Sequence, residues 1–181
     1  MRKAFVITWL LVLLAFVVVL FWHYEYVYSL PTPIPQNYRN ISTGTTIDIT
    51  RILPVNTHKP VLLHFYNPDC PCSRFNIQHF NSLVNQYGDE IQFVIIPVTK
   101  KQTTVNDILK KFDVTVPVIF DTTLAADCGV YSTPQAVLID TNRQLFFRGN
   151  YNKNRYCSDK QTEYARLAIV KLLHNLSLIH I

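Results

Sequence analysis

The stretch Val61-Leu-Leu-His-Phe-Tyr66 runs directly into Asn67-Pro-Asp-Cys70-Pro-Cys72-Ser-Arg74, and this junction decides the fold. The first segment is short and largely apolar, as in a buried strand, and the Asn-Pro pair that follows ends it. From Pro71 onward apolar residues recur at helical spacing until Gly88, a residue typical of helix ends. Proline is well tolerated in a first helical turn. Cys70 is therefore predicted to be the N-cap residue of a helix.

Strands and helices continue to alternate after this junction. Apolar runs predict further buried strands at residues 91–98, 116–120, 136–139 and 145–148. Two more helices are expected: one over 105–112, capped by Thr103 or Thr104, and one with an apolar stripe over 165–176, behind a capping box of Ser158 and Gln161. This alternation predicts an α/β sandwich whose central sheet is covered on both faces.

Cys70 is the leading candidate for a catalytic residue. A sulfur atom at a helix N-cap faces unpaired backbone N–H groups and the positive end of the helix dipole. Both features stabilise the thiolate, which is the attacking form of cysteine. Arg74, one turn further along, is expected to tune the thiolate with its positive charge. We therefore expect Cys70 to be nucleophilic at neutral pH.

The junction resembles the active-site region of thioredoxin-fold proteins, in which an aromatic-rich strand runs into Cys-x-x-Cys and a basic residue. The segment Gly129-Val-Tyr-Ser-Thr133-Pro134-Gln-Ala-Val-Leu-Ile-Asp140 resembles the one that carries this family's cis-proline. Val116-Pro-Val-Ile-Phe-Asp121 resembles membrane-anchored redoxins of the periplasmic thiol–disulfide oxidoreductase type. The resemblance implies a thioredoxin-like three-layer sandwich with a central mixed sheet. It also implies that Thr133 and Pro134 shape a substrate groove beside Cys70.

The second cysteine departs from the family pattern. When Cys70 is aligned with the family's nucleophile, Ser73 occupies the place of the second cysteine and Cys72 lies one residue early. Residues two apart on a helix point about 200° apart, so a Cys70–Cys72 disulfide requires local unwinding. A strained bond of this kind is easily reduced and comparatively oxidising. Cys72 remains the first choice for the residue that resolves a mixed disulfide.

Two other cysteines are auxiliary or resolving candidates. Cys157, shortly before the last helix, is the second choice, and Cys128 precedes the cis-proline loop. In thioredoxin-fold proteins both segments approach the active-site end of the sheet. The alternatives are a structural disulfide between these two cysteines or a free buried thiol at either position. Four cysteines allow three complete pairings, and the sequence does not choose among them.

Two other functions stay open. A copper-binding chaperone of thioredoxin fold would use Cys70 and Cys72 together with His64 and His79, because sulfur and imidazole are suitable copper ligands. Against it, His64 lies on a core strand and His79 on helix positions expected to face solvent. A peroxiredoxin-like peroxidase would have Thr or Ser three residues before its reactive cysteine, where this chain has Asn67. The leading hypothesis needs no cofactor and no metal.

The N-terminal residues predict a membrane segment. Arg2 and Lys3 precede residues 4–22, an uncharged run whose only polar residue is Thr8. A helix of this length spans roughly 28 Å, close to the hydrocarbon thickness of a bilayer. The run ends in bulky aromatic residues, which favours an uncleaved signal-anchor over a cleaved signal peptide. The two basic residues predict an inner-membrane protein whose globular domain is periplasmic or otherwise extracytoplasmic.

The chain is thus expected to have four parts: a signal-anchor transmembrane helix at 1–24, a proline-containing spacer at 25–54 that leads into a thioredoxin-like domain at 55–176, and a tail of doubtful origin at 177–181. Of 17 basic residues two belong to the membrane segment, which leaves little excess over the 12 acidic ones, so no nucleic-acid partner is expected. The sequence predicts a thiol–disulfide oxidoreductase that acts on protein thiols or disulfides of the cell envelope.

Overall fold

The computed structural model describes residues 2–52 and 58–177, and the chain divides into two compact units, Met1–Ile34 and Pro35–Ile181. The expected domain start at residue 55 and the tail residues 178–181 lie outside the described residues.

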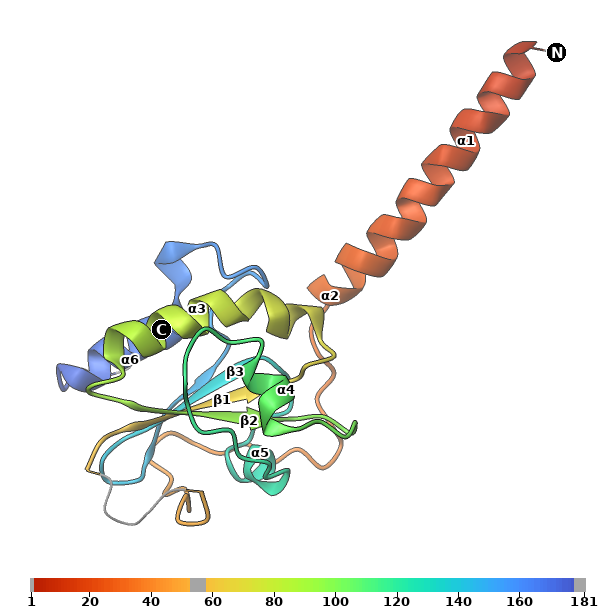
Figure 1. Cartoon of the computed structure of the whole chain (residues 1–181). Helices are drawn as coiled ribbons and strands as arrows, with labels where there is room; N and C mark the ends of the chain where they lie inside the picture. Colours follow the sequence, from red (N-terminus) through yellow and green to blue (C-terminus); the bar gives the residue numbers. More distant parts are fainter. Residues whose placement is uncertain (1, 53–57, 178–181) are drawn as a thin grey trace. The chain divides into compact units, whose positions relative to one another are not determined.

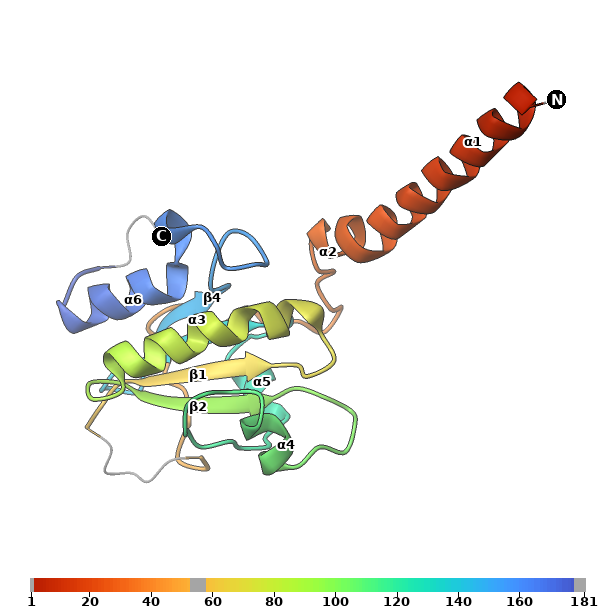
Figure 2. The same ribbon diagram turned by 45° about the horizontal axis from the view of Figure 1, so that its top comes forward.

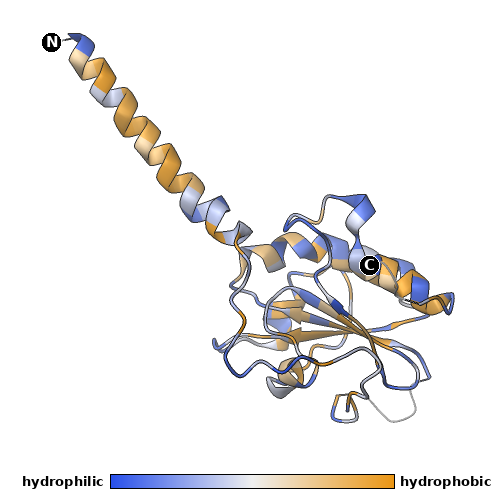
Figure 3. Ribbon diagram, turned by 180° about the vertical axis from the view of Figure 1, so that it is seen from behind, coloured by the Kyte–Doolittle hydropathy of each residue, from blue (hydrophilic) through white to orange (hydrophobic). Residues whose placement is uncertain are grey.

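The N-terminal unit is one helix. It consists of α1 (Arg2–Phe21), a π-helical turn η1 (Trp22–Tyr26) and α2 (Val27–Ser29). Over Arg2–Ser29 none of the most apolar 18-residue window is buried, and the mean hydropathy of that window is 3.0. Figure 3 shows the apolar colour along nearly the whole of α1. By length and composition this helix is able to cross a membrane, and a signal sequence would share both features.

The second unit is built on a four-stranded sheet. Its strands are β1 (Val61–Tyr66), β2 (Gln92–Pro97), β3 (Gln135–Ile139) and β4 (Leu145–Gly149), in the order β2-β1-β3-β4. β1 is parallel to β2 and antiparallel to β3, and β3 is antiparallel to β4, so the sheet is mixed. Every residue of the central strand β1 is buried. The junction of β1 with the next helix therefore leaves the sheet from a fully buried strand that is paired on both sides (Figure 1).

Helices cover both faces of this sheet. α3 (Pro71–Tyr87) and α6 (Tyr164–Leu173) lie side by side on one face, and the short α5 (Thr123–Asp127) lies on the other (Figures 1 and 2). Side chains of β1 alternate between the two core clusters, with Leu62 on the α3 side and Leu63 on the α5 side. Ile108, from α4 (Val105–Leu109), joins the α3-side cluster. The predicted three-layer sandwich with a central mixed sheet is confirmed.

The strand predicted at 116–120 is wrong. The segment forms a single parallel bridge, between Val118 and Ile95 of β2. Ile95 exchanges hydrogen bonds with this segment, donating to the carbonyl of Pro117 at 2.9 Å and accepting from Ile119 at 3.0 Å. Pro117 itself has no N–H group, and proline is disfavoured inside a sheet ladder for that reason.

The predicted start of the last helix is also wrong. Residues Lys160–Thr162 form a 3₁₀ turn, in which the Asp159 carboxylate accepts from the Gln161 N–H at 3.0 Å, and α6 begins only at Tyr164. The capping box of Ser158 and Gln161 therefore does not form. At α4 the prediction holds, because Thr104 is the N-cap residue and makes a capping box with Asp107.

Candidate active site

Cys70 occupies the N-cap of α3, as predicted. Its backbone is extended, with φ −87° and ψ 123°, and Pro71 starts the helix. A turn led by Asn67 delivers the chain from β1 to this point: the Asn67 carbonyl accepts from the Cys70 N–H at 3.1 Å, and its side-chain oxygen accepts from the Asp69 N–H at 2.9 Å. Cys70 is half-buried, so its sulfur remains within reach of solvent.

The segment predicted to carry a cis-proline lies against this sulfur. The Thr133–Pro134 peptide bond is cis. The Cys70 thiol donates a long hydrogen bond, 3.9 Å, to the carbonyl of Thr133. The two motifs that the sequence placed 63 residues apart are thus in contact. An extended peptide lying beside Pro134 would run past the Cys70 sulfur.

The surroundings of Cys70 favour its ionised form. The largest influence is a hydrogen bond from the Cys72 thiol, followed by the opposing effect of burial and by the backbone N–H groups of Ser73 and Cys72. Together these lower the pKa of Cys70 from 9.0 to about 6. At pH 7 this corresponds to roughly ten thiolates for each thiol. A low pKa of this kind is typical of a nucleophilic cysteine.

Ser73 also lowers the pKa of Cys70, a role that the sequence analysis did not identify. Its side chain is completely buried, and its hydroxyl accepts from the Asn67 N–H at 3.2 Å. The same hydroxyl has its proton free to donate to the Cys70 thiolate, and it lowers the pKa of Cys70. Ser73 is the third residue of the helix after the N-cap. That spacing, which is typical of reciprocal capping, was the sequence signal available for it.

Cys72 lies closer to Cys70 than the helical repeat suggests. The 200° separation holds for two helical residues, whereas the extended backbone of Cys70 turns its sulfur toward the first turn of α3. The hydrogen bond to Cys70, burial and the negative charge of the Cys70 thiolate all raise the pKa of Cys72, and Arg155 lowers it. Of the two thiols, Cys70 therefore loses its proton first, and Cys72 stays protonated. All four cysteines are free thiols in the structure.

Arg74, the residue expected to tune the thiolate, is exposed on α3. Hydrogen bonds from Cys72 and Ser73, rather than the charge of Arg74, account for most of the low pKa of Cys70. Arg74 acts on Tyr66, whose pKa it lowers against the larger raising effect of burial.

Cys157 lies beside α3, one helical turn beyond Cys72. The buried amide of Asn76 donates a hydrogen bond to its sulfur at 3.1 Å. Burial raises the pKa of Cys157, and the bond from Asn76 opposes that shift. The backbone of Cys157 has φ 54°, in the left-handed region that favours glycine.

Cys128 lies elsewhere. It is fully buried with Leu124 and Val137 in the core cluster on the α5 side of the sheet, whereas Cys157 packs on the α3 side. Burial raises the pKa of Cys128 to about 12. The structure therefore places the two auxiliary candidates on opposite faces of the sheet, and only Cys157 approaches the α3 cysteines.

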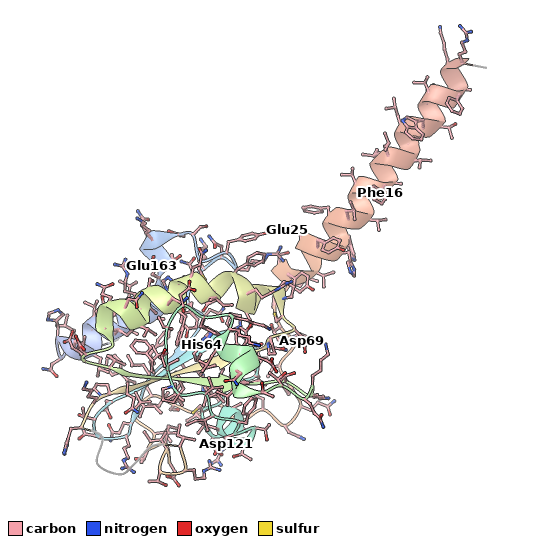
Figure 4. All side chains as sticks on the ribbon, viewed as in Figure 1. Phe16, Glu25, His64, Asp69, Asp121 and Glu163 are labelled. Carbon is pink, nitrogen blue, oxygen red and sulfur yellow. The ribbon has the colours of Figure 1, made fainter. Side chains whose placement is uncertain are left out.

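The two histidines considered as copper ligands lie in the interior. His64 stacks on Phe80 with ring centroids 4.4 Å apart, and its Nδ1 is 2.7 Å from the hydroxyl of Tyr151. Burial lowers the pKa of His64 to about 3. Figure 4 shows His64 in the interior beneath α3.

His79 was expected to face solvent, and that expectation is wrong. It is 9% exposed, since the Glu163 carboxylate, 3.9 Å away, and the ring of Tyr151 cover it. Residues 2–52 and 58–177 contain no group of three or more His, Cys, Asp or Glu side chains arranged to hold a metal ion. The cysteines and histidines of the copper hypothesis are thus not brought together.

The fold is shared with solved structures. A hypothetical protein from Sinorhizobium meliloti 1021 is 18% identical and superposes with a TM-score of 0.66, over 80% of this chain and 91% of that one. A putative thiol:disulfide interchange protein DsbE from Chlorobium tepidum is 21% identical, with a TM-score of 0.53 over 65% of this chain and 82% of the other. A thioredoxin-like protein in its oxidised form is 16% identical, with the same TM-score over 67% and 82%. The second unit therefore has a thioredoxin-like fold.

Residues 43–178 match the family described as Domain of unknown function (DUF6436), and the chain belongs to this family. No curated protein matches the chain significantly.

Proposed function

We propose that this protein is a membrane-tethered thiol–disulfide oxidoreductase that acts outside the cytoplasm through Cys70. The observation that carries the proposal is a half-buried cysteine sulfur at a helix start, 3.9 Å from the carbonyl of Thr133 in a cis-proline loop, with surroundings that lower its pKa. The thiolate supplies the nucleophile, and the loop supplies backbone groups for an extended substrate peptide. The thioredoxin-like fold of the domain is consistent with this chemistry.

The reaction uses Cys70 and Cys72 in turn. The Cys70 thiolate attacks one sulfur of a substrate disulfide, forms a mixed disulfide and expels the other substrate sulfur as a thiolate. Cys72 then loses its proton and attacks the Cys70 sulfur, which forms Cys70–Cys72 and releases the second substrate thiolate. The substrate gains two electrons and the protein loses two. The reverse sequence oxidises a substrate dithiol.

Cys72 must lose its proton before it attacks, and formation of the mixed disulfide at Cys70 makes this loss easier. Both the hydrogen bond to Cys70 and the Cys70 negative charge raise the pKa of Cys72. Once the Cys70 sulfur is part of a mixed disulfide, it carries no charge and both effects disappear. Burial still raises the pKa of Cys72, while Arg155 lowers it. Cys72 therefore releases its proton more readily in the mixed disulfide than it does while Cys70 is a thiolate.

The partners and the location follow from the N-terminal unit. The apolar helix Arg2–Ser29 anchors the protein in the inner membrane, and Arg2 and Lys3 favour a cytoplasmic N-terminus. The globular unit then meets protein thiols and disulfides of the cell envelope. Thr133 and Pro134 form the wall of the groove in which the substrate peptide lies.

The test is turnover by the full chain in detergent. With glutathione as reductant and a fluorogenic disulfide-bonded peptide as substrate, the wild type should reduce the peptide catalytically. Cys70→Ser should lower the rate roughly 100-fold or more, because it removes the nucleophile. Cys128→Ser is the matched control, because it removes one buried thiol on the other face of the sheet. This variant should keep the wild-type rate. A Cys70→Ser protein that still turns over would refute the proposal.

A further inference from the structure

The segment that contains Cys157 packs along the first two turns of α3. The ring of Tyr156 lies 4.9 Å from that of Phe75, measured between centroids, and the guanidinium of Arg155 lies 5.7 Å from the Phe75 centroid. Cys157 itself accepts a hydrogen bond from Asn76 at 3.1 Å. Three consecutive residues thus contact the part of α3 that follows the catalytic cysteines.

These contacts bring Cys157 near Cys72. Cys72 and Asn76 are four residues apart in α3, so they lie on one face of the helix with Cβ atoms roughly 5–6 Å apart. The Cys157 sulfur, which contacts the Asn76 side chain at 3.1 Å, therefore lies beside the face of α3 that also carries Cys72, one turn further along the helix. Arg155 of the same segment also lowers the pKa of Cys72, in keeping with its place over the Phe75 ring.

The surroundings of Cys157 are unusual for an inert thiol. Asn76 is completely buried, and its side-chain oxygen has no hydrogen-bond partner. Its side-chain N–H group donates to the Cys157 sulfur. An N–H group directed at sulfur bonds more strongly to a thiolate than to a thiol. The left-handed backbone of Cys157 is a second unfavourable feature, and such strained residues cluster at functional sites.

We propose that Cys157 is a third redox-active thiol. It attacks the Cys72 sulfur of the Cys70–Cys72 disulfide and forms a new disulfide with Cys72. This inference rests on the proposed function, because that function generates the first disulfide. Cys72 is then the central sulfur of a relay, able to pair with a neighbour on either side. The oxidised protein comes to rest with a Cys72–Cys157 disulfide and a free Cys70.

The step is an internal thiol–disulfide exchange. Cys157 loses its proton to solvent, and its thiolate attacks the Cys72 sulfur. The S–S bond to Cys70 breaks, and Cys70 leaves as a thiolate. No net oxidation or reduction occurs, since one disulfide replaces another. Cys70 is a better leaving group than Cys157 because its pKa is lower than that of Cys157.

The relay has a consequence for the proposed reaction. Resolution by Cys72 alone leaves Cys70 in a disulfide, where it cannot attack. The second exchange returns Cys70 to the thiolate form while the protein still holds the two oxidising equivalents. The hydrogen bond from Asn76 positions Cys157 for this step, so Asn76 is a positioning residue.

The experiment maps disulfides over time. The reduced full chain in detergent is mixed with oxidised glutathione, quenched by acid at intervals, alkylated in denaturant so that every free thiol reacts, digested and analysed by mass spectrometry. Cys70–Cys72 should appear first and decay into Cys72–Cys157, with Cys70 and Cys128 alkylated at the end. In Cys157→Ser, Cys70–Cys72 should persist, and its equilibrium with glutathione should shift at least ~10-fold toward the reduced form.

Two further variants keep the result interpretable. Asn76→Leu should slow the conversion to Cys72–Cys157 without slowing formation of Cys70–Cys72, whereas a merely structural role would change neither rate selectively. Cys128→Ser should leave the whole time course unchanged. If Cys70–Cys72 forms and Cys157 stays alkylated throughout, the relay is wrong and the proposed function stands. If Cys70 never exchanges with glutathione, the proposed function and the relay both fail.

Discussion

The pKa of Cys70 is set by the groups around its sulfur at the helix start: first the Cys72 thiol and then, against burial, the backbone N–H groups of Ser73 and Cys72. The Cys72 thiol donates to the thiolate, and the buried Ser73 hydroxyl does the same while the Asn67 N–H holds it in place. The charge of Arg74 contributes less, because that side chain is exposed to solvent, which screens it. Each of these effects is separable by substitution.

We expect the alkylation rate of Cys70 by iodoacetamide to be half-maximal near pH 6 and to fall as the pH decreases, since the thiolate is the reactive form. Ser73→Ala and Cys72→Ala should each move this midpoint upward, Cys72→Ala by more, because the Cys72 hydrogen bond is the larger influence. Shifts of about one pH unit are expected. Arg74→Gln serves as the control and should change the midpoint least. Equal midpoints in all four proteins would contradict this account.

The buried side chain of His64 makes the stability of the fold depend on pH. Its ring is fully buried between Phe80 and the hydroxyl of Tyr151, and its Nε2 has no hydrogen-bond partner. Burial lowers the pKa of His64 from 6.5 to about 3, so the unfolded chain binds a proton more readily than the folded one between these values. The stability contributed by neutral His64 is therefore complete above pH 6.5. It is lost progressively as the pH falls toward 3.

We expect the free energy of unfolding in urea to fall between pH 7 and pH 4.5 by about 2–3 kcal/mol more in the wild type than in His64→Gln. Glutamine keeps a polar group for the Tyr151 hydroxyl but does not titrate in this range. The comparison between the two proteins removes the contribution of the carboxylates, which titrate in both. An identical pH dependence would show that His64 accepts its proton without unfolding.

At the level of elements, Arg148 of β4 ties three segments together. One guanidinium nitrogen donates to the carbonyls of Ile41 and Cys128, at 3.0 and 3.1 Å, and another donates to the side chain of Asn40 at 2.9 Å. Gly129 follows α5 with φ +68°, and a Cβ atom there would collide with the Arg148 guanidinium. The chain leading to the cis-proline loop is thereby fixed on the sheet.

Gly129→Ala should lower the free energy of unfolding by about 3 kcal/mol, because it adds backbone strain and displaces a partly buried charged donor from its carbonyls. Gly44→Ala is the matched control. Gly44 has φ +84° but no atom within 4 Å of an added Cβ, so only the strain of about 1 kcal/mol applies. Urea unfolding of the full chain in detergent measures both. Equal losses would mean that Arg148 relocates freely.

Elements with local signals could be predicted from the sequence. β1, the start of α3 at Pro71 and the contact of the Thr133–Pro134 loop with Cys70 follow from apolar runs, proline positions and a recurring motif. The strand at 116–120 was overpredicted, because an apolar run does not show that Pro117 removes a ladder donor.

Interactions between distant segments left no such signal. Asn76 and Cys157 are 81 residues apart, and nothing in either local pattern pairs them. The exposed position predicted for His79 was wrong for the same reason, since helical periodicity does not reveal that Glu163 and its neighbours cover that face. Figure 4 shows Glu163 next to α3. The position of Cys70 at the helix start was therefore predictable, whereas the contacts of Ser73, Asn76 and His79 were not.

For the whole molecule, the proposed function makes the direction of the apolar helix decisive for the thiols that Cys70 can meet. Arg2 and Lys3 are the first two residues of the helix Arg2–Ser29, ahead of its uncharged run. Because basic residues are retained in the cytoplasm, these charges favour an extracytoplasmic globular unit. Deletion of residues 2–29 should move the protein from the membrane pellet to the soluble fraction after carbonate extraction. A deleted protein that stays in the pellet would show that another part of the chain binds the membrane.

Orientation is measured with a membrane-impermeant maleimide on spheroplasts that express the full chain under reducing conditions. Cys70 should be labelled without detergent, since it is half-buried and ionised, while the fully buried Cys128 should stay unlabelled before and after lysis. Replacing both Arg2 and Lys3 by alanine weakens the charge bias, so a fraction of Cys70 should become labelled only after lysis. If wild-type Cys70 is labelled only after lysis, the globular unit lies in the cytoplasm. Its substrates would then be the thiols of a reducing compartment.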